Sequence, residues 1–251
     1  MLQIITKDVT ERVKEKNLNA KLLDELSRKN NDLMQFSYIV SHNIRAPIAQ
    51  ILGLCYLIKM PNINDSERNK IIDLFSESAN NIDALIKDLN NILTAKVPLN
   101  ENKEKISIPS LLINIKELLK KQIEETKADI QIDIQKNSEE IYTLKRYLES
   151  ILFNLISNSI KHKSPERNPV IRINVAKKSH TIITISDNGL GIDMKLYGDQ
   201  VFGLYKRFNL SKEGKGLGLH MTKLQVEAMN GRITLKSKLD VGTVVRIELP
   251  K

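Results

Sequence analysis

The stretch HTIITISDNGLGID, residues 180–193, decides the fold of the second half of the chain. Its β-branched residues predict a strand that ends at Asp187. Gly189 and Gly191 then allow the backbone to turn closely around a ligand. A buried carboxylate at the end of this strand could accept a hydrogen bond from an amine, such as the exocyclic amino group of adenine. The alternative is a plain hairpin turn at Asp-Asn-Gly, which the second glycine and Asp193 disfavour.

The flanking segments predict a mixed sheet covered by helices. We expect helices where apolar residues recur every three or four positions, and strands where they alternate with polar residues. Strands are predicted at 106–108, 128–136, 170–178, 180–187, 232–238 and 242–250, and helices at 110–126, 143–163 and 218–229. This order predicts an α+β sandwich in which a helix layer packs on one face of a mixed sheet.

Two asparagines mark one face of the helix predicted at 143–163. Asn154 and Asn158 are four residues apart and therefore lie on the same helix face, with Lys161 about one turn further. Amide oxygens are hard ligands suited to a Mg²⁺ ion that already carries phosphates and waters. Lysine acts as a point charge for phosphate. Taken alone, this pair of asparagines is not specific to a metal site.

A glycine-rich segment, FGLYKRFNLSKEGKGLGLH at 202–220, follows the strand–turn unit. Its last glycine, Gly218, begins the next predicted helix, and glycine amides at a helix N-terminus bind phosphate through unpaired N–H groups. A basic pair, Lys206 and Arg207, lies among aromatic anchors, and residues 209–215 are interpreted as a lid. The glycine spacing fits neither the Rossmann nor the P-loop pattern.

The first half of the chain predicts two long helices. Apolar residues between 11 and 58 recur at spacings of three, four and seven, which indicates one helix. A proline-containing break follows, with Asn64, Asp65 and Ser66 as candidate N-caps of the second helix. The apolar face of that helix covers about three positions in seven, which is typical of a bundle. We therefore predict a helical hairpin that forms a homodimeric four-helix bundle through residues 33–94.

His42 is expected on the solvent side of the first helix. Val40 and Ile44 are predicted core positions, and each lies two residues from His42, which is about 200° around the helix axis. An exposed imidazole is mostly neutral at pH 7 and can act as a nucleophile. A metal site is disfavoured, because no second ligand stands three or four residues away.

The composition predicts a soluble, cytoplasmic chain without a membrane span. Hydrophobic residues make up 41% and aromatic residues 4%, a balance that favours helix bundles over sandwiches. No apolar run reaches the roughly 18 residues of a span, and a lone cysteine, Cys55, fits a reducing compartment. The net charge of +9 raises the question of a nucleic-acid partner. Because the lysines are spread along the chain, we predict a solvated surface and no nucleic-acid partner.

Taken together and in order, these motifs resemble those of the sensor histidine kinases. FSYIVSHNIRAPIAQILGL resembles the phospho-acceptor box, NLISNSIKH the asparagine box, DNGLGI the first glycine box, FGLYKRF the phenylalanine box and GKGLGL the second glycine box. The resemblance covers roughly residues 33–251. The segment IITKDVTERVKEK also resembles the exit of a PAS sensor domain into a signalling helix.

The resemblance implies a three-part organisation and a phosphoryl-transfer activity. A signalling helix at 1–32 would lead from an upstream PAS-like sensor that is absent from this chain. A dimerisation and phospho-acceptor domain would occupy 33–97, and a Bergerat-type catalytic ATP-binding domain 103–251. The chain would autophosphorylate His42 from ATP and pass the phosphoryl group to an aspartate of a response regulator receiver domain.

The resemblance also assigns residues to the nucleotide. Asp187 would contact adenine, and Asn158 together with Asn154 would hold Mg²⁺. The implied nucleotide-binding residues are Asn154, Asn158, Lys161, His162, Asp187, Gly189, Gly191, Arg207, Lys215, Gly216, Leu217, Gly218 and Thr243.

Three positions depart from the family pattern. Most relatives carry a carboxylate after the histidine, whereas Asn43 can accept a hydrogen bond but not a proton. We therefore expect slow autophosphorylation. Ala46 stands where phosphatase-competent relatives orient a water with Thr or Asn, so we expect weak or no phosphatase activity. His162 stands where relatives often carry an aromatic residue near adenine, and it either stacks on the base or caps the helix.

Three other functions fit parts of the sequence. The first is a catalytically silent scaffold that binds ATP, and its main support is Asn43, which replaces the usual carboxylate. An ATPase of the same nucleotide fold would need a catalytic glutamate at the position of Asn154, which argues against hydrolysis. A basic nucleic-acid binder has only the net charge in its favour.

Overall fold

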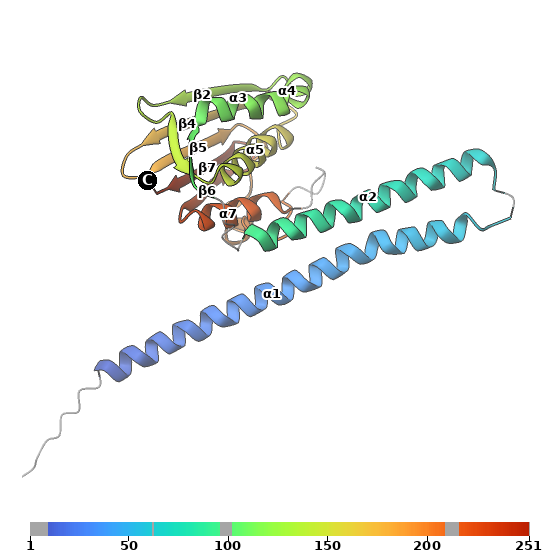
Figure 1. Ribbon diagram of the computed structural model, residues 1–251, viewed down its shortest axis with the longest axis horizontal. Coiled ribbons are helices and arrows are strands. Elements are labelled where there is room, and N and C mark those ends of the chain that lie inside the picture. The colour runs from blue at the N-terminus through green and yellow to red at the C-terminus, as the bar shows by residue number, and fades with distance from the viewer. Residues whose placement is uncertain (1–9, 62, 96–101, 209–215, 251) are drawn as a thin grey trace, which may run out of the picture. The chain divides into compact units, whose positions relative to one another are not determined.

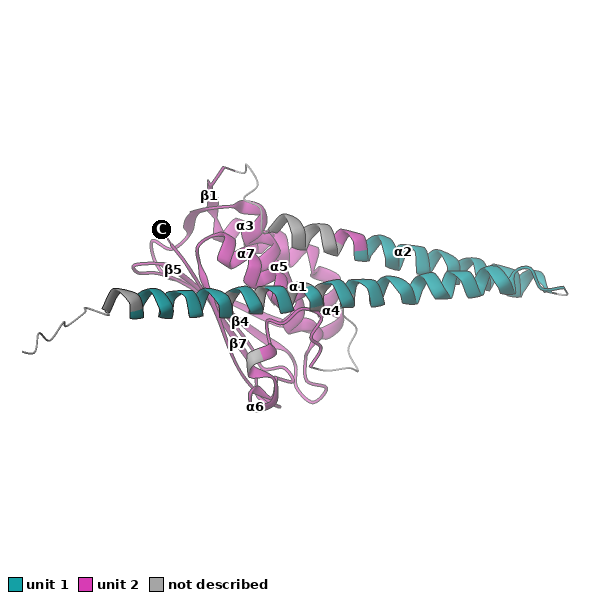
Figure 2. Cartoon of the chain, turned by 90° about the horizontal axis from the view of Figure 1, so that it is seen from below, with its two compact units in different colours: residues 1–85 teal, residues 86–251 magenta. Residues whose placement is uncertain are grey.

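A computed structural model describes residues 10–61, 63–95, 102–208 and 216–250. The chain divides into two compact units, residues 1–85 and residues 86–251, which Figure 2 colours separately. The first unit is helical, and the second combines helices with strands. None of the helices in the described ranges has an apolar stretch long enough to cross a membrane.

The first unit is built on two long helices that run in opposite directions (Figure 1). Helix α1 spans Thr10–Leu57, and α2 spans Asp65–Ala95. The predicted helix at 11–58 and the predicted restart after a capped turn are therefore confirmed. Helix α1 continues through Pro47, although proline removes one backbone hydrogen bond.

The two helices bury only part of their apolar surface. Leu54 and Leu85 are 6% and 7% exposed, and Ser78 is fully buried. The hydroxyl of Ser78 donates to the carbonyl of Leu74 at 2.8 Å, which satisfies its polar group inside the helix. Other apolar residues of α2 remain open to solvent, with Ile72 and Ile86 49% and 47% exposed.

A reciprocal cap begins α2. The Glu67 N–H donates to Asn64 Oδ1 at 2.9 Å, and the Asn64 N–H donates to Glu67 Oε2 at 3.2 Å. This capping box satisfies two backbone donors at the helix start. Of the three candidate caps in the sequence, Asn64 is the one whose side chain accepts from the first turn.

Replacing Asn64 with Ala is expected to lower the free energy of unfolding of the hairpin by about 1 kcal/mol, because the Glu67 N–H loses its acceptor. Urea denaturation followed by circular dichroism measures the change. Asn64→Asp keeps an acceptor at the same place and serves as the control. Equal stability of Asn64→Ala and the unmodified chain would contradict a stabilising cap.

The second unit contains a five-stranded mixed sheet in the order β2-β4-β5-β7-β6. Its strands are β2 Asp129–Ile134, β4 Val170–Lys177, β5 Thr181–Asp187, β6 Arg232–Lys238 and β7 Gly242–Leu249. β2 pairs with β4 in parallel, and the other neighbours are antiparallel. A separate antiparallel pair joins β1 Glu104–Ser107 to β3 Glu140–Thr143.

Helices cover one face of this sheet (Figure 1). They are α3 Ile108–Leu118, α4 Lys120–Thr126, α5 Lys145–Lys161 and α7 Gly218–Ala228. Strand residues alternate between this layer and solvent: Ile171, Ile173 and Val175 are buried, whereas Arg172 and Asn174 are exposed. The predicted α+β domain with a helix layer on a mixed sheet is therefore confirmed.

The core of the second unit lies between α5 and the sheet. Ile151, Leu152 and Ile156 of α5 are fully buried at helical spacing and belong to one cluster with Ile173 and Ile247 of the sheet. Each buried Leu or Ile side chain contributes on the order of 2 kcal/mol of transfer free energy. This packing fixes α5, the helix that carries the asparagine pair.

Three local predictions were wrong in detail. The helix predicted at 110–126 is two helices, α3 and α4, separated at Leu119, which is buried at the break. β3 was missed, because its four residues adjoin the helix predicted from 143. The short helix α6, Met194–Tyr197, and a 3-10 turn at Gly198–Gln200 were also missed. Asp193 caps α6 by accepting from Lys195 N–H at 3.0 Å.

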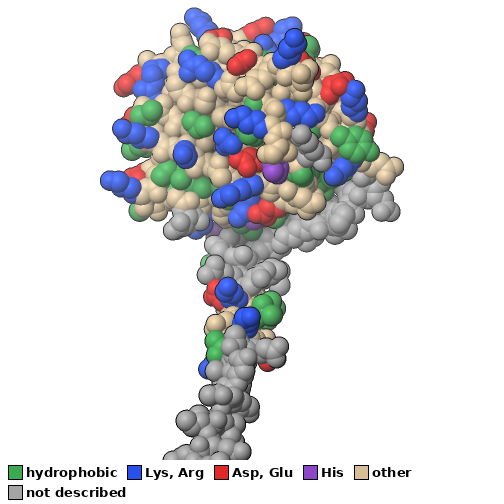
Figure 3. Space-filling model, turned by 90° about the vertical axis from the view of Figure 1, so that its left-hand side faces the viewer, with side chains coloured by type: hydrophobic (Ala, Val, Ile, Leu, Met, Phe, Trp, Pro, Cys, Tyr) green, Lys and Arg blue, Asp and Glu red, His purple; other side chains and the backbone are tan. Residues whose placement is uncertain are grey.

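Charges are distributed over the surface of the second unit. On the face drawn in Figure 3, Lys and Arg side chains are scattered and Asp and Glu side chains lie among them. Among the described ion pairs, Lys105 and Glu140 join the two strands of the small β1–β3 sheet at 2.6 Å. On this face the basic residues do not gather into one stripe.

Candidate nucleotide-binding site

A cavity of about 410 Å³ lies in the second unit, lined by residues from α5, the turn after β5 and the start of α7. The lining includes ten of the predicted nucleotide-binding residues: Asn158, Lys161, His162, Asp187, Gly191, Arg207, Gly216, Leu217, Gly218 and Thr243. Asn154 and Gly189 are not among the lining residues, although both contact residues that are. Lys215 and the predicted lid at 209–215 lie outside the described residues.

Asp187 is held by three hydrogen bonds at the end of β5. Its Oδ1 accepts from the Gly189 N–H at 2.9 Å and from the Thr243 N–H at 3.2 Å, and its Oδ2 accepts from the Ser159 hydroxyl at 3.1 Å. Burial raises the pKa of Asp187, while these hydrogen bonds act in the opposite direction. A carboxylate has about four lone-pair sites, so Oδ2 can accept one further hydrogen bond from a ligand.

The turn after Asp187 requires a glycine at position 191. Gly191 has a φ of +66°, a left-handed conformation that other residues rarely adopt. A Cβ atom there would overlap the backbone oxygen of Lys238. The Asp240 N–H also donates to the Leu190 carbonyl at 2.7 Å, so the turn packs directly on the β6–β7 connection.

The two asparagines of α5 have different surroundings. Asn158 lines the cavity, and its amide nitrogen donates to Asn154 Oδ1 at 3.4 Å. The oxygen is therefore the atom of the Asn158 amide that can coordinate a cation. Asn154 instead donates to the Thr222 hydroxyl of α7 at 2.7 Å, and a Cβ atom on Gly218 would overlap Asn154 Oδ1. Asn154 thus joins α5 to α7.

Cationic side chains and backbone amides border the same cavity. Lys161, Lys206 and Arg207 contribute to its lining together with the first residues of α7. Leu217 stands at the N-cap of α7, and its side chain provides no cap for the amides of the first turn. Amides at a helix N-terminus and nearby cations form a site for an anion such as a phosphate.

His162 stands at the C-cap of α5 and also lines the cavity. Its N–H donates to the Asn158 carbonyl at 2.9 Å, and its carbonyl accepts from the Leu190 N–H at 2.9 Å. The backbone of His162 therefore ends the helix and supports the turn after β5, which leaves both predicted roles, capping and stacking, compatible with its position.

Comparison with known families assigns this part of the chain. Residues 143–251 match the family described as histidine kinase-, DNA gyrase B-, and HSP90-like ATPase. We call residues 143–251 the ATPase domain, after the family that they match. The domain includes every described element from α5 to β7, and hence the cavity with Asp187 and the amides of α7.

Relatives of known name extend beyond the ATPase domain. Cyanobacterial phytochrome A of Nostoc sp. is 28% identical over 92% of this chain, and histidine protein kinase SaeS of Staphylococcus aureus is 25% identical over 91% of it. The cell-division control histidine kinase PdhS of Brucella ovis is 26% identical over 98%. The chain spans 30% of the phytochrome, 25% of PdhS and 67% of SaeS. The resemblance to sensor histidine kinases is thereby confirmed.

Solved structures share the fold of the chain. Histidine kinase ThkA, in a complex with the response regulator protein TrrA, matches over 98% of this chain and 68% of that chain, with a TM-score of 0.67 and 20% identity. Acinetobacter baumannii histidine kinase AdeS matches over 83% of this chain and 97% of its own, with a TM-score of 0.62 and 18% identity. The arrangement of helices followed by the ATPase domain is therefore a histidine-kinase fold.

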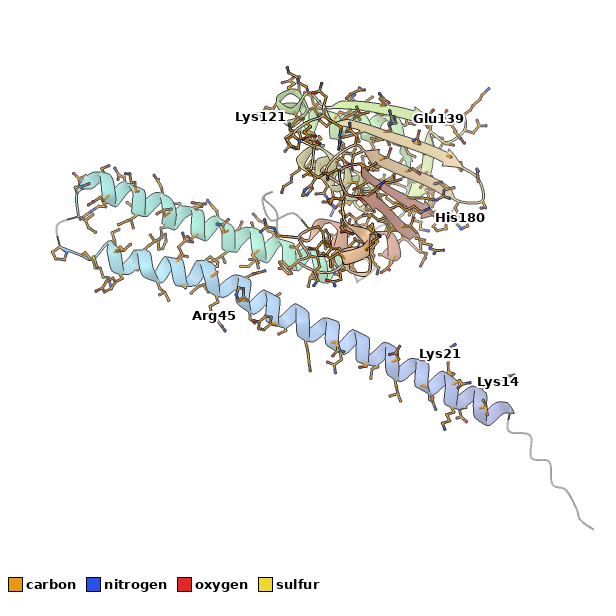
Figure 4. All side chains as sticks on the ribbon, turned by 180° about the vertical axis from the view of Figure 1, so that it is seen from behind. Lys14, Lys21, Arg45, Lys121, Glu139 and His180 are labelled. Atoms are coloured by element: carbon orange, nitrogen blue, oxygen red, sulfur yellow. The ribbon has the colours of Figure 1, made fainter. Side chains whose placement is uncertain are left out.

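His42 lies outside the ATPase domain, on α1 of the first unit. Its side chain is exposed, as the helical spacing predicted, whereas Asn43 is half-buried. The imidazole stacks on Tyr38, one turn earlier, with 6.3 Å between ring centroids and 29° between planes. Arg45 projects from α1 on the side away from α2 (Figure 4). The exposed ring can be reached by a reactant from solvent.

Several residues of the ATPase domain site were not predicted. Ser159 holds Asp187, and Lys206, which was predicted only as part of a basic pair, lies in the lining next to Arg207. Most of the apolar lining was also missed. It consists of Leu155, Leu190, Ile192, Val201, Phe208, Leu217, Leu219, Leu235 and Val245, of which Leu217 was assigned to the nucleotide and Phe208 was one of the expected aromatic anchors. The alternation of apolar and polar residues along β6 and β7 could have indicated two of them. Leu235 and Val245 are register partners on the face of the sheet that meets the helices.

Proposed function

We propose that this chain is the transmitter part of an ATP-dependent protein-histidine kinase, which phosphorylates His42 and passes the phosphoryl group to an aspartate of a response regulator. The observation that carries the proposal is the cavity of the ATPase domain, which combines an apolar lining, one hydrogen-bonded carboxylate and a basic border. The kinases among its relatives support the reaction type, and the likeness to ThkA in its complex with a response regulator supports the partner.

Adenine is the base that the cavity fits. Leu155, Ile192 and Val245 provide apolar surface for a flat ring. Asp187 can accept a hydrogen bond from the exocyclic amino group through Oδ2, while Ser159 holds that oxygen in place. A base with a carbonyl oxygen at the same position, such as guanine, would place two acceptors against each other.

The phosphates would lie toward the basic residues and the N-terminus of α7. Lys161, Lys206 and Arg207 neutralise charge, and the amides that follow Gly216 donate hydrogen bonds to the phosphate oxygens. The residues present fit a Mg²⁺ ion that is carried mainly by the phosphates: Asn158 offers one amide oxygen, and the assignment of Asn154 as a second ligand stays a prediction. When bound, Mg²⁺ would neutralise charge on the phosphates.

The imidazole of His42 accepts the phosphoryl group in this proposal. A ring nitrogen attacks the γ-phosphorus, the bond from that phosphorus to the oxygen bridging the β- and γ-phosphates breaks, and ADP leaves. The proton on the other nitrogen of the attacking ring passes to water, because Asn43 cannot take it. A receiver aspartate then removes the phosphoryl group from the histidine by forming a new P–O bond as the P–N bond breaks.

The first unit would dimerise with a second copy. The apolar row of α2 that includes Ile72 and Ile86 is exposed in one chain, as are Ile48 and Leu52 of α1, and a four-helix bundle would bury these residues. We assign residues 33–97 to dimerisation and phospho-acceptance, 103–251 to catalysis, and 1–32 to a signalling helix from an upstream PAS-like sensor. The low phosphatase activity expected from Ala46 also stays a prediction.

Incubation with γ-labelled ATP and Mg²⁺ tests the reaction. The chain is expected to gain an acid-labile, base-stable label that His42→Gln abolishes, with unchanged nucleotide binding in that variant. Addition of a cognate receiver domain is expected to move the label from the kinase to the receiver. ATP binding without label would instead support a silent scaffold, and release of free phosphate would support an ATPase.

Replacing Asn43 with Asp is expected to raise the rate of label uptake about tenfold or more, because the carboxylate can take the imidazole proton that Asn43 cannot. Initial rates at saturating ATP measure the effect. Asn43→Ser, which also lacks a base, is the control and should not exceed the unmodified chain. Equal rates for Asn43→Asp and the unmodified chain would contradict the prediction that the lack of a carboxylate at position 43 slows phosphorylation of His42.

A further inference from the structure

Arg167 contacts the backbone behind the adenine site. It lies in the connection between α5 and β4 and is half-buried. Its Nε donates to the Asn188 carbonyl at 3.3 Å, and its Nη2 donates to the Gly189 carbonyl at 3.2 Å. A guanidinium group is a rigid fork, so two consecutive carbonyls held by one arginine have a fixed relative orientation.

The side chain of Asn188 joins the same two segments. Its Oδ1 accepts from the Val170 N–H at 2.8 Å, and its Nδ2 donates to the Asn168 carbonyl at 3.0 Å. The connection that carries Arg167 is therefore attached to the turn after β5 by the side chains of both segments. These hydrogen bonds fix the connection relative to the turn, and with it the position of the guanidinium group.

Each carbonyl that Arg167 binds belongs to a peptide group whose N–H donates to a residue that lines the cavity. The N–H of the Asn188–Gly189 peptide donates to Asp187 Oδ1 at 2.9 Å. The N–H of the Gly189–Leu190 peptide donates to the His162 carbonyl at 2.9 Å. A positive charge on the carbonyl side of a peptide strengthens its N–H as a donor, and hydrogen bonds in series polarise one another by about 10–30% per bond.

We propose that Arg167 is a positioning residue for adenine recognition, which acts through the Asn188–Gly189 peptide on Asp187. It orients the carboxylate, and the second peptide ties the end of α5 to the same turn. This inference rests on the proposed ATP site and goes beyond it, because Arg167 lies outside the cavity lining and outside the residues that the family motifs assign.

Binding of ATP and of purine riboside triphosphate tests the proposal, since the second nucleotide lacks the exocyclic amino group that Asp187 would accept from. Isothermal titration calorimetry on the whole chain gives both dissociation constants. Arg167→Gln is expected to weaken ATP binding about tenfold and purine riboside triphosphate binding less than about twofold. Arg172→Gln, an arginine exposed on β4, is the matched control and should change neither.

The outcomes separate this inference from the function on which it rests. Equal weakening of both nucleotides by Arg167→Gln would overturn the inference alone and assign the arginine a purely structural role. Failure of the unmodified chain to bind ATP, or to prefer it to purine riboside triphosphate, would overturn the proposed adenine site and the inference with it. If Arg167→Gln does not fold, Arg167→Lys, which keeps the charge but loses the fork that binds both carbonyls, is expected to show a smaller loss that is still selective for ATP.

Discussion

Replacing Asp187 with Asn is expected to weaken ATP binding about 100-fold, the upper range for a hydrogen bond to a charged group. The amide oxygen of the substituted side chain can still accept from Gly189 and Thr243, so the turn keeps its backbone contacts. An amide NH₂ then replaces Oδ2 and meets the amino group of adenine, and two donors face each other. Isothermal titration calorimetry measures the dissociation constant.

The control for this variant is Asp193→Asn. Asp193 is the next carboxyl group along the same turn, and its side chain caps α6 through Lys195 and Leu196. Asparagine is an equally good N-cap, so nucleotide binding should be unchanged. If Asp187→Asn bound ATP as tightly as the unmodified chain, the carboxylate could not be the adenine acceptor.

The pKa of Asp187 adds a pH dependence to the same interaction. Burial raises this pKa above the ordinary value of an aspartate. The ionised carboxyl group is the acceptor, so affinity for ATP is full above the raised pKa and is lost as the pH falls through it. Titrating the unmodified chain and Asp187→Asn with ATP over a series of pH values measures this dependence, and the variant should show no such loss.

Replacing Gly191 with Ala is expected to lower the free energy of unfolding of the ATPase domain by about 3 kcal/mol. Two costs add together. The left-handed φ of +66° disfavours a side chain, and a Cβ atom would overlap the Lys238 backbone oxygen, which cannot move without shifting β6. Urea denaturation followed by circular dichroism measures the loss, since the chain has no Trp.

Gly198→Ala is the matched control in the same region. Its φ of −50° is helical, and the nearest atom to an added Cβ would be the Met194 side-chain methyl at 3.7 Å. Its stability should stay within about 0.5 kcal/mol of the unmodified chain. A Gly191→Ala variant as stable as Gly198→Ala would show that the turn after β5 relaxes readily and does not need glycine.

Features with a strong local cause were predictable from sequence. Asp187 and Gly191 were foreseen because a strand that ends in a carboxylate and spaced glycines is typical of a backbone that turns around a ligand. Both long helices were foreseen because their apolar spacing extends over many turns. By contrast, the break at Leu119 has no Gly or Pro to mark it, since a buried leucine continues the apolar pattern of both helices.

Features that depend on long-range packing were not predictable. Ser159 and Arg167 are ordinary residue types that reach the site because α5 and its following connection pack beside β5. Asn154 is a residue for which the sequence pattern did not indicate the contact that the fold produces. Its spacing from Asn158 gave it the same predicted role, but only the placement of α7 reveals the hydrogen bond to Thr222.

The hydrogen bond between Asn154 and Thr222 of α7 bears on whether a bound nucleotide could be hydrolysed. The Thr222 hydroxyl gives its proton to the Gly218 carbonyl at 3.0 Å and so receives one from Asn154. A glutamate at 154, the group that would activate water in a hydrolysing relative, brings no proton to this junction, so the Thr222 hydroxyl would have to turn from the Gly218 carbonyl to donate to it. Under the proposed function, Asn154 therefore joins the two helices and leaves no carboxylate at this position to activate water.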